Sequence, residues 1–216
     1  MQNKLTEIYT ALLTHYGDPK WWPAKTPYEV IVGAILAQNT AWSNVKKAIA
    51  NFGDNLSPEY VVRLKPDELA DIIRPAGFFN QKASYLHEVT RWFGQYGNDV
   101  NVVNKLPLQR VRAELLALKG VGHETADSIL LYAFGFPSFV VDAYTIRLLS
   151  RLPIDVGNGY EATKSLFEEN LPLEAGFFNR YHALIVINAK EHCRKNPVCG
   201  GCPLVDVCEA GKGKTI

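Results

Sequence analysis

The four cysteines of this 216-residue chain lie close together near its C-terminal end. Cys199 and Cys202 form a C-x-x-C pair, and Cys193 and Cys208 flank it with five residues on either side. Four thiolates at such spacing can bind a tetrahedral zinc ion or a [4Fe–4S] cluster. Zinc ribbons usually have two C-x-x-C pairs, but spacing alone leaves both metals open. Because a disulfide framework usually spreads its cysteines through a chain, we expect a metal site instead.

A second candidate site is a glycine turn at residues 119–122. Apolar residues recur at helical spacing on both sides of this turn, over 111–118 and 126–134, so the sequence predicts a hairpin of two helices. Gly120 and Gly122 can adopt backbone angles that a side chain would forbid. The N–H groups of such a turn, next to a helix N-terminus, can bind a phosphate oxygen. This pattern predicts a contact with a nucleic-acid backbone that is independent of base sequence.

A single acid, Asp142, follows the apolar pair Val140-Val141 and precedes apolar residues at helical spacing over 143–149. Asp142 is therefore predicted to be a helix N-cap, where backbone amides and the helix dipole keep a carboxylate ionised. Near a phosphate contact, such an acid could stabilise a developing cation or activate a water. The alternative is that Asp142 is only a cap and the glycine turn only a turn.

Almost the whole chain is predicted to be helical, with short loops and no linker or repeat. Besides the hairpin, helices are expected over residues 1–16, 27–37, 42–52, 58–64, 66–73, 80–96, 143–151, 160–169 and 175–193. The segment 27–37 is apolar nearly all round, which predicts a buried central helix. The β-branched residues of this segment would also suit a strand, but no partner strand is evident.

The composition is that of an ordinary globular protein, with 47% apolar and 21% charged residues. No apolar run is long enough to span a membrane, and the N-terminus does not resemble a signal peptide, so we expect a cytoplasmic protein, associated with the nucleoid in a prokaryote. We also expect it to be a monomer. The net charge of +1 neither favours nor excludes nucleic acid. A DNA-binding protein needs only a local basic face.

These motifs resemble the endonuclease III, or helix-hairpin-helix-GPD, superfamily of DNA glycosylases. The matching residues are 118–122, 125–126, 135–137 and 141–142, together with the cysteine loop, whose first gap is one residue shorter than in the common family form. The resemblance implies an all-α protein of two helical lobes with the DNA and base cleft between them. It implies a helical barrel over 25–134 that ends in the hairpin, and a second lobe from 1–24 and 135–216 with a [4Fe–4S] loop at 193–208.

The resemblance also implies roles for individual residues, with double-stranded DNA containing a damaged base as the partner. Asp142 would be the catalytic aspartate, and Gln38 and Phe78 would fill the gap and wedge the opposite strand when a base is flipped out. Phe78 could instead belong to the core. The implied DNA contacts are Lys119, Gly120, Val121, Gly122, Arg194 and Lys195, of which the last two could instead face solvent; the implied cluster ligands are Cys193, Cys199, Cys202 and Cys208.

The expected reaction follows from Glu124 and the aromatic residues. Bifunctional members of the family have a lysine at the position of Glu124, so hydrolysis of the N-glycosidic bond without an amine-driven strand cut is predicted. The tryptophans and the acid resemble the 3-methyladenine DNA glycosylase branch, whose best-known members lack the cluster cysteines. Cation–π stacking would select an alkylated, cationic purine. The expected base pocket is Trp21, Trp22, Pro23, Trp42 and Glu124, although Glu124 is also explained as a helix-start acid and the tryptophans as core.

Three rival functions remain open from the sequence. The first is an endonuclease III-like glycosylase for oxidised pyrimidines or for G·T or G·U mismatches. The second is a non-catalytic iron–sulfur DNA-binding protein. The third is a zinc module with an unrelated role.

Overall fold

The computed structural model of this chain describes residues 1–19 and 24–211, which contain helices and no strand. The predicted all-α class is therefore confirmed. In chain order the elements are α1 (Gln2–Tyr16), α2 (Pro27–Leu36), α3 (Trp42–Ala50), η1 (Gly53–Asn55), α4 (Pro58–Arg63), α5 (Pro66–Ile72), η2 (Arg74–Ala76), α6 (Phe79–Gly94), α7 (Val100–Val103), α8 (Leu108–Ala117), α9 (His123–Ser128), η3 (Ile129–Ala133), α10 (Ala143–Leu149), α11 (Gly159–Asn170) and α12 (Ala175–Glu191). None of these helices is long and apolar enough to cross a membrane.

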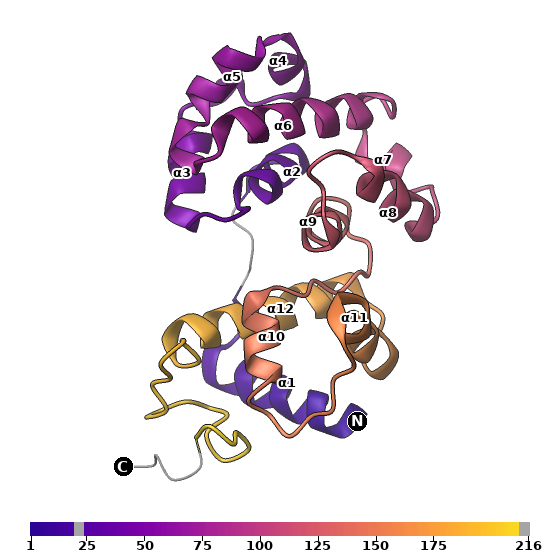
Figure 1. Cartoon of the computed structure of the whole chain (residues 1–216). Coiled ribbons are helices and arrows are strands. Elements are labelled where there is room, and N and C mark those ends of the chain that lie inside the picture. The colour runs from indigo at the N-terminus through magenta and orange to yellow at the C-terminus, as the bar shows by residue number, and fades with distance from the viewer. Residues whose placement is uncertain (20–23, 212–216) are drawn as a thin grey trace. The chain divides into compact units, whose positions relative to one another are not determined.

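The chain divides into two compact units, each of which is described by itself (Figure 1). The first unit combines Met1–Trp21 with Pro137–Ile216, and the second is Trp22–Phe136. The hairpin of α8 and α9 belongs to the second unit. Asp142 and the four cysteines belong to the first unit.

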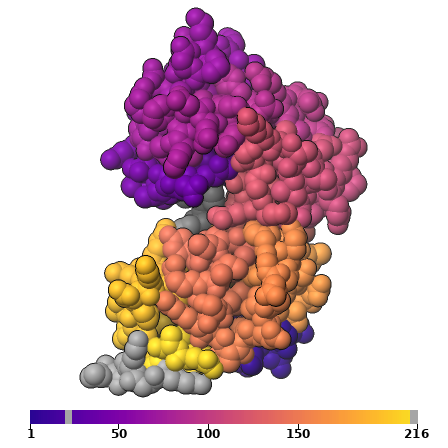
Figure 2. Space-filling model, viewed as in Figure 1, coloured from indigo at the N-terminus to yellow at the C-terminus, as the bar shows by residue number. Residues whose placement is uncertain are grey.

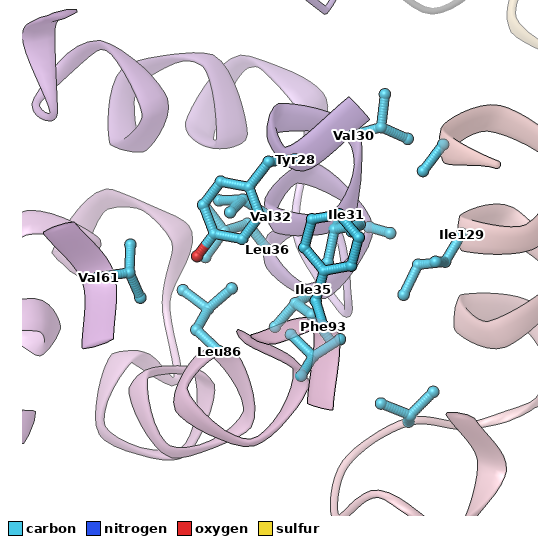
Figure 3. Packing of buried hydrophobic residues seen from close by; sticks show 14 of the residues in the cluster. Tyr28, Val30, Ile31, Val32, Ile35, Leu36, Val61, Leu86, Phe93 and Ile129 are labelled. Carbon is cyan, nitrogen blue, oxygen red and sulfur yellow. The ribbon is translucent and has the colours of Figure 1, made fainter. Parts of the chain in front are cut away.

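Helix α2 forms the centre of the second unit (Figure 3). It begins at Pro27 after an N-cap, Thr26, whose hydroxyl accepts a hydrogen bond from the Glu29 N–H at 3.1 Å. Every residue from Val30 to Leu36 is buried, as expected for a helix that is apolar all round. Helix α6 and the π-helical turn η3 pack against it, and Phe93 and Ile129 contribute to the same core (Figure 3). The prediction of a buried central helix is confirmed.

The first unit joins both ends of the chain around α12. Helices α1 and α10 pack against α12, and the space-filling view shows the indigo N-terminal segment on the same unit as the orange to yellow segments (Figure 2). In its core the rings of Phe139 and Phe167 stack with centroids 3.8 Å apart. The buried hydroxyl of Tyr181 donates a hydrogen bond to the Leu5 carbonyl at 2.8 Å, which ties α12 to α1. This core supports the segment that leads into Asp142.

Candidate active site and metal loop

The glycine turn has the predicted hairpin form, but its two glycines have different conformations. Gly120 has a φ of +84°, in the region that favours glycine. Gly122 is the N-cap of α9 with a φ of −91° and a ψ of 177°, which any residue can adopt. Gly120 therefore uses the conformational freedom of glycine, and Gly122 does not. An extended N-cap before α9 already turns the chain, so only one residue has to be left-handed.

Gly120 is also confined by a neighbouring ring. A Cβ built on Gly120 would lie 2.3 Å from Cγ of Tyr85 on α6, closer than any carbon contact allows. A Cβ on Gly122 would meet no atom within 4 Å. The protein's own packing therefore requires glycine at 120 and leaves open space at 122.

The turn is held by Gln38, which lies two residues beyond the end of α2. The Gln38 side-chain N–H₂ group donates hydrogen bonds to the Gly120 carbonyl at 2.8 Å and to the Thr125 hydroxyl at 3.0 Å. Both ends of the turn are thus fixed to the end of the central helix. The proposed role of Gln38 in filling the space of a flipped base stays a prediction, and it would require these donors to exchange partners.

An ion pair joins the two helices of the hairpin. Arg112 on α8 donates two hydrogen bonds to the fully buried Asp127 on α9, at 2.8 Å and 3.0 Å. A bidentate pair of this kind fixes orientation as well as distance. Sequence reasoning missed it, although the two residues stand at helical positions on either side of the turn. The pair makes the hairpin a rigid element that can present its turn to a ligand.

The outer residues of the hairpin are accessible. Lys119 and Glu124 are exposed, whereas Val121 is buried at 6% exposure and anchors the turn in the core. Glu124 lies in the first turn of α9, where an acid is favoured by the helix dipole. The assignment of Glu124 to the position of the lysine in bifunctional relatives stays a prediction.

Phe78 is presented outward by a strained turn. It is the N-cap of α6 with φ 46° and ψ 32°, and 65% of its surface is exposed. A left-handed phenylalanine is rare, and such a conformation persists only where the surroundings impose it. The buried Lys82 stabilises this turn, since its Nζ donates to the carbonyls of Ala76 at 2.8 Å and Leu36 at 2.9 Å. Burial lowers the pKa of Lys82 to about 8.

The expected base pocket falls partly outside the described residues. Trp21, Trp22 and Pro23 lie in the undescribed segment 20–23. Trp42 begins α3, is half-buried and packs against the core cluster that contains α2. The assignment of these residues to a base pocket stays a prediction.

Asp142 has the N-cap position that the sequence predicts. One carboxylate oxygen accepts hydrogen bonds from the Thr145 N–H at 2.7 Å and from the Thr145 hydroxyl at 3.0 Å. The other oxygen lies 3.4 Å from Nε2 of His182 on α12. Only 11% of the Asp142 side chain is exposed. One carboxylate oxygen is thus fixed by Thr145, and the other faces the imidazole of His182.

The ionisation of Asp142 is set by opposing effects. Burial alone would raise its pKa, but the charge and hydrogen bond of His182 and the two bonds from Thr145 act in the other direction. The resulting pKa of Asp142 lies below its ordinary value. Asp142 is therefore an anion at neutral pH in a mostly dry environment, where a charge acts more strongly than in water.

A buried polar group fixes the backbone that leads into Asp142. Lys164 on α11 donates to the Ser138 hydroxyl and to the Glu168 carboxylate, each at 2.5 Å. The same carboxylate accepts a bond from the Phe139 N–H at 2.8 Å. Sequence reasoning did not identify these residues, because nothing in the chain order brings 138 and 164 together. They leave Asp142 little freedom to move.

The four cysteines line one pocket, which Arg151 and Asn188 also line. All four are free cysteines, one of them buried and three partly exposed. Nη1 of Arg151 lies 3.1 Å from Sγ of Cys193. The buried side-chain nitrogen of Asn188 has no hydrogen-bond partner within the described residues. In residues 1–19 and 24–211, no three metal-binding side chains converge as they would on a single ion.

The two basic residues of this loop are exposed. Arg194 donates from Nε to the Lys190 carbonyl at 2.7 Å, at the end of α12, and the Lys195 carbonyl accepts a bond from Arg151. Their side chains are accessible to a phosphate, but contact with DNA stays a prediction.

Comparisons with known proteins agree with these features. The model of the HhH-GPD superfamily of base excision DNA repair proteins matches residues 32–173. A Methanocaldococcus jannaschii protein assigned as a DNA repair glycosylase is 49% identical over 208 residues, covering 94% of each chain. Endonuclease III of Thermotoga maritima is 30% identical over 195 residues, covering 87% of each. The crystal structure of H. pylori 3-methyladenine DNA glycosylase bound to 1,N6-ethenoadenine has a TM-score of 0.71 and 28% identity, covering 88% of this chain and 97% of that chain.

The family match spans the hairpin and Asp142, which are the features that the geometry marks as a candidate site. The match to the Methanocaldococcus protein extends over nearly all of both chains. The chain therefore belongs to the HhH-GPD superfamily of base excision DNA repair proteins, as a DNA glycosylase.

Proposed function

We propose that this protein is a monofunctional DNA glycosylase that excises an alkylated, 3-methyladenine-like base, with Asp142 as its catalytic residue. The observation that carries the proposal is the Asp142 carboxylate itself. Its pKa lies below the ordinary value, its side chain is only 11% exposed, one oxygen is fixed by Thr145 and the other faces His182. Such a preorganised charge stabilises positive charge that develops on a substrate without having to reorganise during the reaction.

The proposed reaction is hydrolysis of the N-glycosidic bond. As this bond breaks, the deoxyribose acquires oxocarbenium character, and the Asp142 anion stabilises it. A water molecule then adds to the sugar, and Asp142 can orient that water or accept its proton. The base leaves with the bonding electron pair, and the product is an abasic site in an uncut strand.

The absence of a strand cut rests on Glu124. An amine at this position could attack the sugar and form a Schiff base that leads to strand cleavage. Glu124 is an exposed carboxylate in the first turn of α9 and cannot form one. We therefore propose that the abasic product persists until alkali or another enzyme acts on it.

The choice of an alkylated base rests on the aromatic residues. An alkylated purine is cationic, so it stacks on electron-rich rings better than a neutral base does and leaves readily. Trp42 is half-buried in the second unit, and Trp21, Trp22 and Pro23 precede α2 in the sequence. The likeness to a 3-methyladenine DNA glycosylase structure with bound 1,N6-ethenoadenine supports this choice. The likeness to endonuclease III of Thermotoga maritima supports the alternative, an endonuclease III-like glycosylase.

We further propose that the four cysteines bind a [4Fe–4S] cluster. The support is the donor set, since four thiols line one pocket, the number and type of ligand that a [4Fe–4S] cluster requires, although within the described residues no three of them converge on one point. The guanidinium of Arg151 stands by Cys193, and the unpartnered Asn188 amide offers a donor to a sulfide or thiolate. When bound, the cluster would cross-link the loop to the end of α12.

A panel of oligonucleotide duplexes tests the proposed function. Each duplex carries one lesion: 3-methyladenine, 1,N6-ethenoadenine, thymine glycol, or thymine or uracil opposite guanine. We expect base release from the 3-methyladenine duplex, with the strand intact until alkali is added; the neutral 1,N6-ethenoadenine duplex shows whether a cationic base is required. Release only from thymine glycol or the mismatches would instead assign the endonuclease III-like function. Binding without release from any duplex would indicate a non-catalytic DNA-binding protein.

A further inference from the structure

The structure places a buried histidine behind the acid of the proposed reaction. His182 lies in the middle of α12, its side chain is 7% exposed, and its Nε2 is 3.4 Å from the Asp142 carboxylate. The ring stands edge-on to Phe139, with centroids 6.4 Å apart. Phe139 precedes Asp142 by three residues, so His182 of α12 contacts this segment at both Phe139 and Asp142.

The two carboxylate oxygens of Asp142 have separate partners. Thr145 donates both its N–H and its hydroxyl to one oxygen, which fixes that oxygen to the first turn of α10. His182 faces the other oxygen. The Thr145 hydrogen bonds fix only one carboxylate oxygen. Without His182, the other oxygen would be free to change its position and would be buried without a donor. The groups that act on the charge of Asp142 therefore come from two helices, α10 and α12.

We propose that His182 is a positioning residue, which orients the Asp142 carboxylate and keeps it ionised for base excision. This inference rests on the proposed function. His182 is 7% exposed, too buried to contact DNA, and its effect on the reaction passes through Asp142, whose second carboxylate oxygen faces Nε2 at 3.4 Å. An imidazole nitrogen at this distance can orient the carboxylate and favour its charged form, which burial alone would disfavour.

Two substitutions separate the donor from the charge. His182→Gln keeps an N–H donor near the position of Nε2 but cannot become a cation. His182→Leu removes both the donor and the charge. His87 offers a matched control, since it is another buried histidine, 6% exposed, in the second unit. His87→Gln tests the effect of a buried His-to-Gln change that does not involve Asp142.

The first measurement uses the protein without DNA. The pKa of the Asp142 carboxyl is followed by NMR in the full chain labelled with ¹³C-aspartate, with Asp142→Asn to assign the signal. We expect the pKa of Asp142 to rise in both His182 variants and to stay unchanged in His87→Gln. An unchanged pKa in His182→Gln would overturn the inference. This result does not depend on which base is excised, or on whether any is.

The second measurement is the single-turnover rate of base release from about pH 3 to about pH 8, so that the window includes the acid limb set by Asp142, whose pKa lies below its ordinary value. At pH 7 we expect His182→Leu to lose roughly tenfold or more, as when a charged group loses a hydrogen bond, and His182→Gln to recover most of that loss. The acid limb should move to higher pH in both variants. A purely structural role would lower the folded fraction without moving this limb, and that outcome would refute the inference while leaving the proposed function intact. If His182→Leu does not fold, His182→Gln still decides through its acid limb.

Discussion

The glycine turn allows a sharp separation of folding from DNA binding, because its two glycines face different surroundings. Gly120→Ala would place a methyl group in a left-handed conformation, φ +84°, and 2.3 Å from the ring of Tyr85. Gly122→Ala would place the same methyl group on an extended backbone, with no protein atom within 4 Å. The two substitutions are chemically identical and lie in one turn.

The expected magnitudes follow from these geometries. A left-handed alanine costs roughly 1–2 kcal/mol and an overpacked contact roughly 1–3 kcal/mol. Gly120→Ala should therefore lower the free energy of unfolding by about 2–5 kcal/mol, and less where the half-buried Tyr85 can shift. Gly122→Ala should change it by less than about 1 kcal/mol, since its backbone needs no adjustment. If the open space beside Gly122 receives a phosphate, the methyl group of the Gly122→Ala variant should weaken binding to undamaged duplex DNA by roughly tenfold. This is the effect of losing a hydrogen bond to a charged group.

Urea unfolding and fluorescence anisotropy at fixed salt measure the two effects. The double variant Gly120→Ala/Tyr85→Ala should cost less than the sum of its single changes, because the clash exists only when both groups are present. Additive costs, or a stable Gly120→Ala, would refute the packing argument. Unchanged DNA affinity in Gly122→Ala would refute the assignment of the turn as a phosphate contact.

The remaining predictions concern the strained turn at Phe78, which Lys82 stabilises, and the cysteine loop at 193–208. Lys82→Met should destabilise the second unit by roughly 2–4 kcal/mol in urea unfolding, because two buried carbonyls lose their donor. The pKa of Lys82 in the folded protein, about 8, lies below the ordinary lysine value of 10.5. Between these pH values the unfolded chain binds more protons than the folded protein does, so Lys82 should make the free energy of unfolding rise with pH. This rise should be absent from Lys82→Met; the same slope in both proteins would contradict the assignment. Cys202→Ser should abolish the broad absorbance near 400 nm that is expected of a [4Fe–4S] cluster and reduce bound iron; zinc in the purified protein, with no such band, would contradict the cluster.

The all-α class and the helix positions were predictable because periodic apolar residues, prolines and caps are local signals. Helix α2 shows this directly, since Thr26, Pro27 and the uninterrupted apolar run all specify one buried helix. The N-cap position of Asp142 followed from the same kind of signal. The four-residue helix α7 was missed, since a single turn carries too little periodicity.

The contacts that hold the candidate site could not be predicted, because they join residues far apart in the sequence. His182 meets Asp142 from α12, Lys82 reaches the end of α2, and Tyr85 confines Gly120. Each of these residues sits at an ordinary helical position in the sequence. Only the packing of one helix on another shows that its polar atom or ring faces a turn or an acid.

The most direct test of the central claim is the rate of base release by Asp142→Asn on the best substrate from the lesion panel, at saturating enzyme and pH 7. Asparagine keeps the size of the side chain and an acceptor for the Thr145 N–H, so folding and DNA affinity should be retained. The account predicts a fall in the rate of roughly a hundredfold or more, because the variant cannot supply a negative charge to the sugar. A rate within about threefold of that of the unsubstituted protein would contradict the claim. Such a small change corresponds to less than about 1.36 kcal/mol of transition-state stabilisation, which by itself provides tenfold in rate.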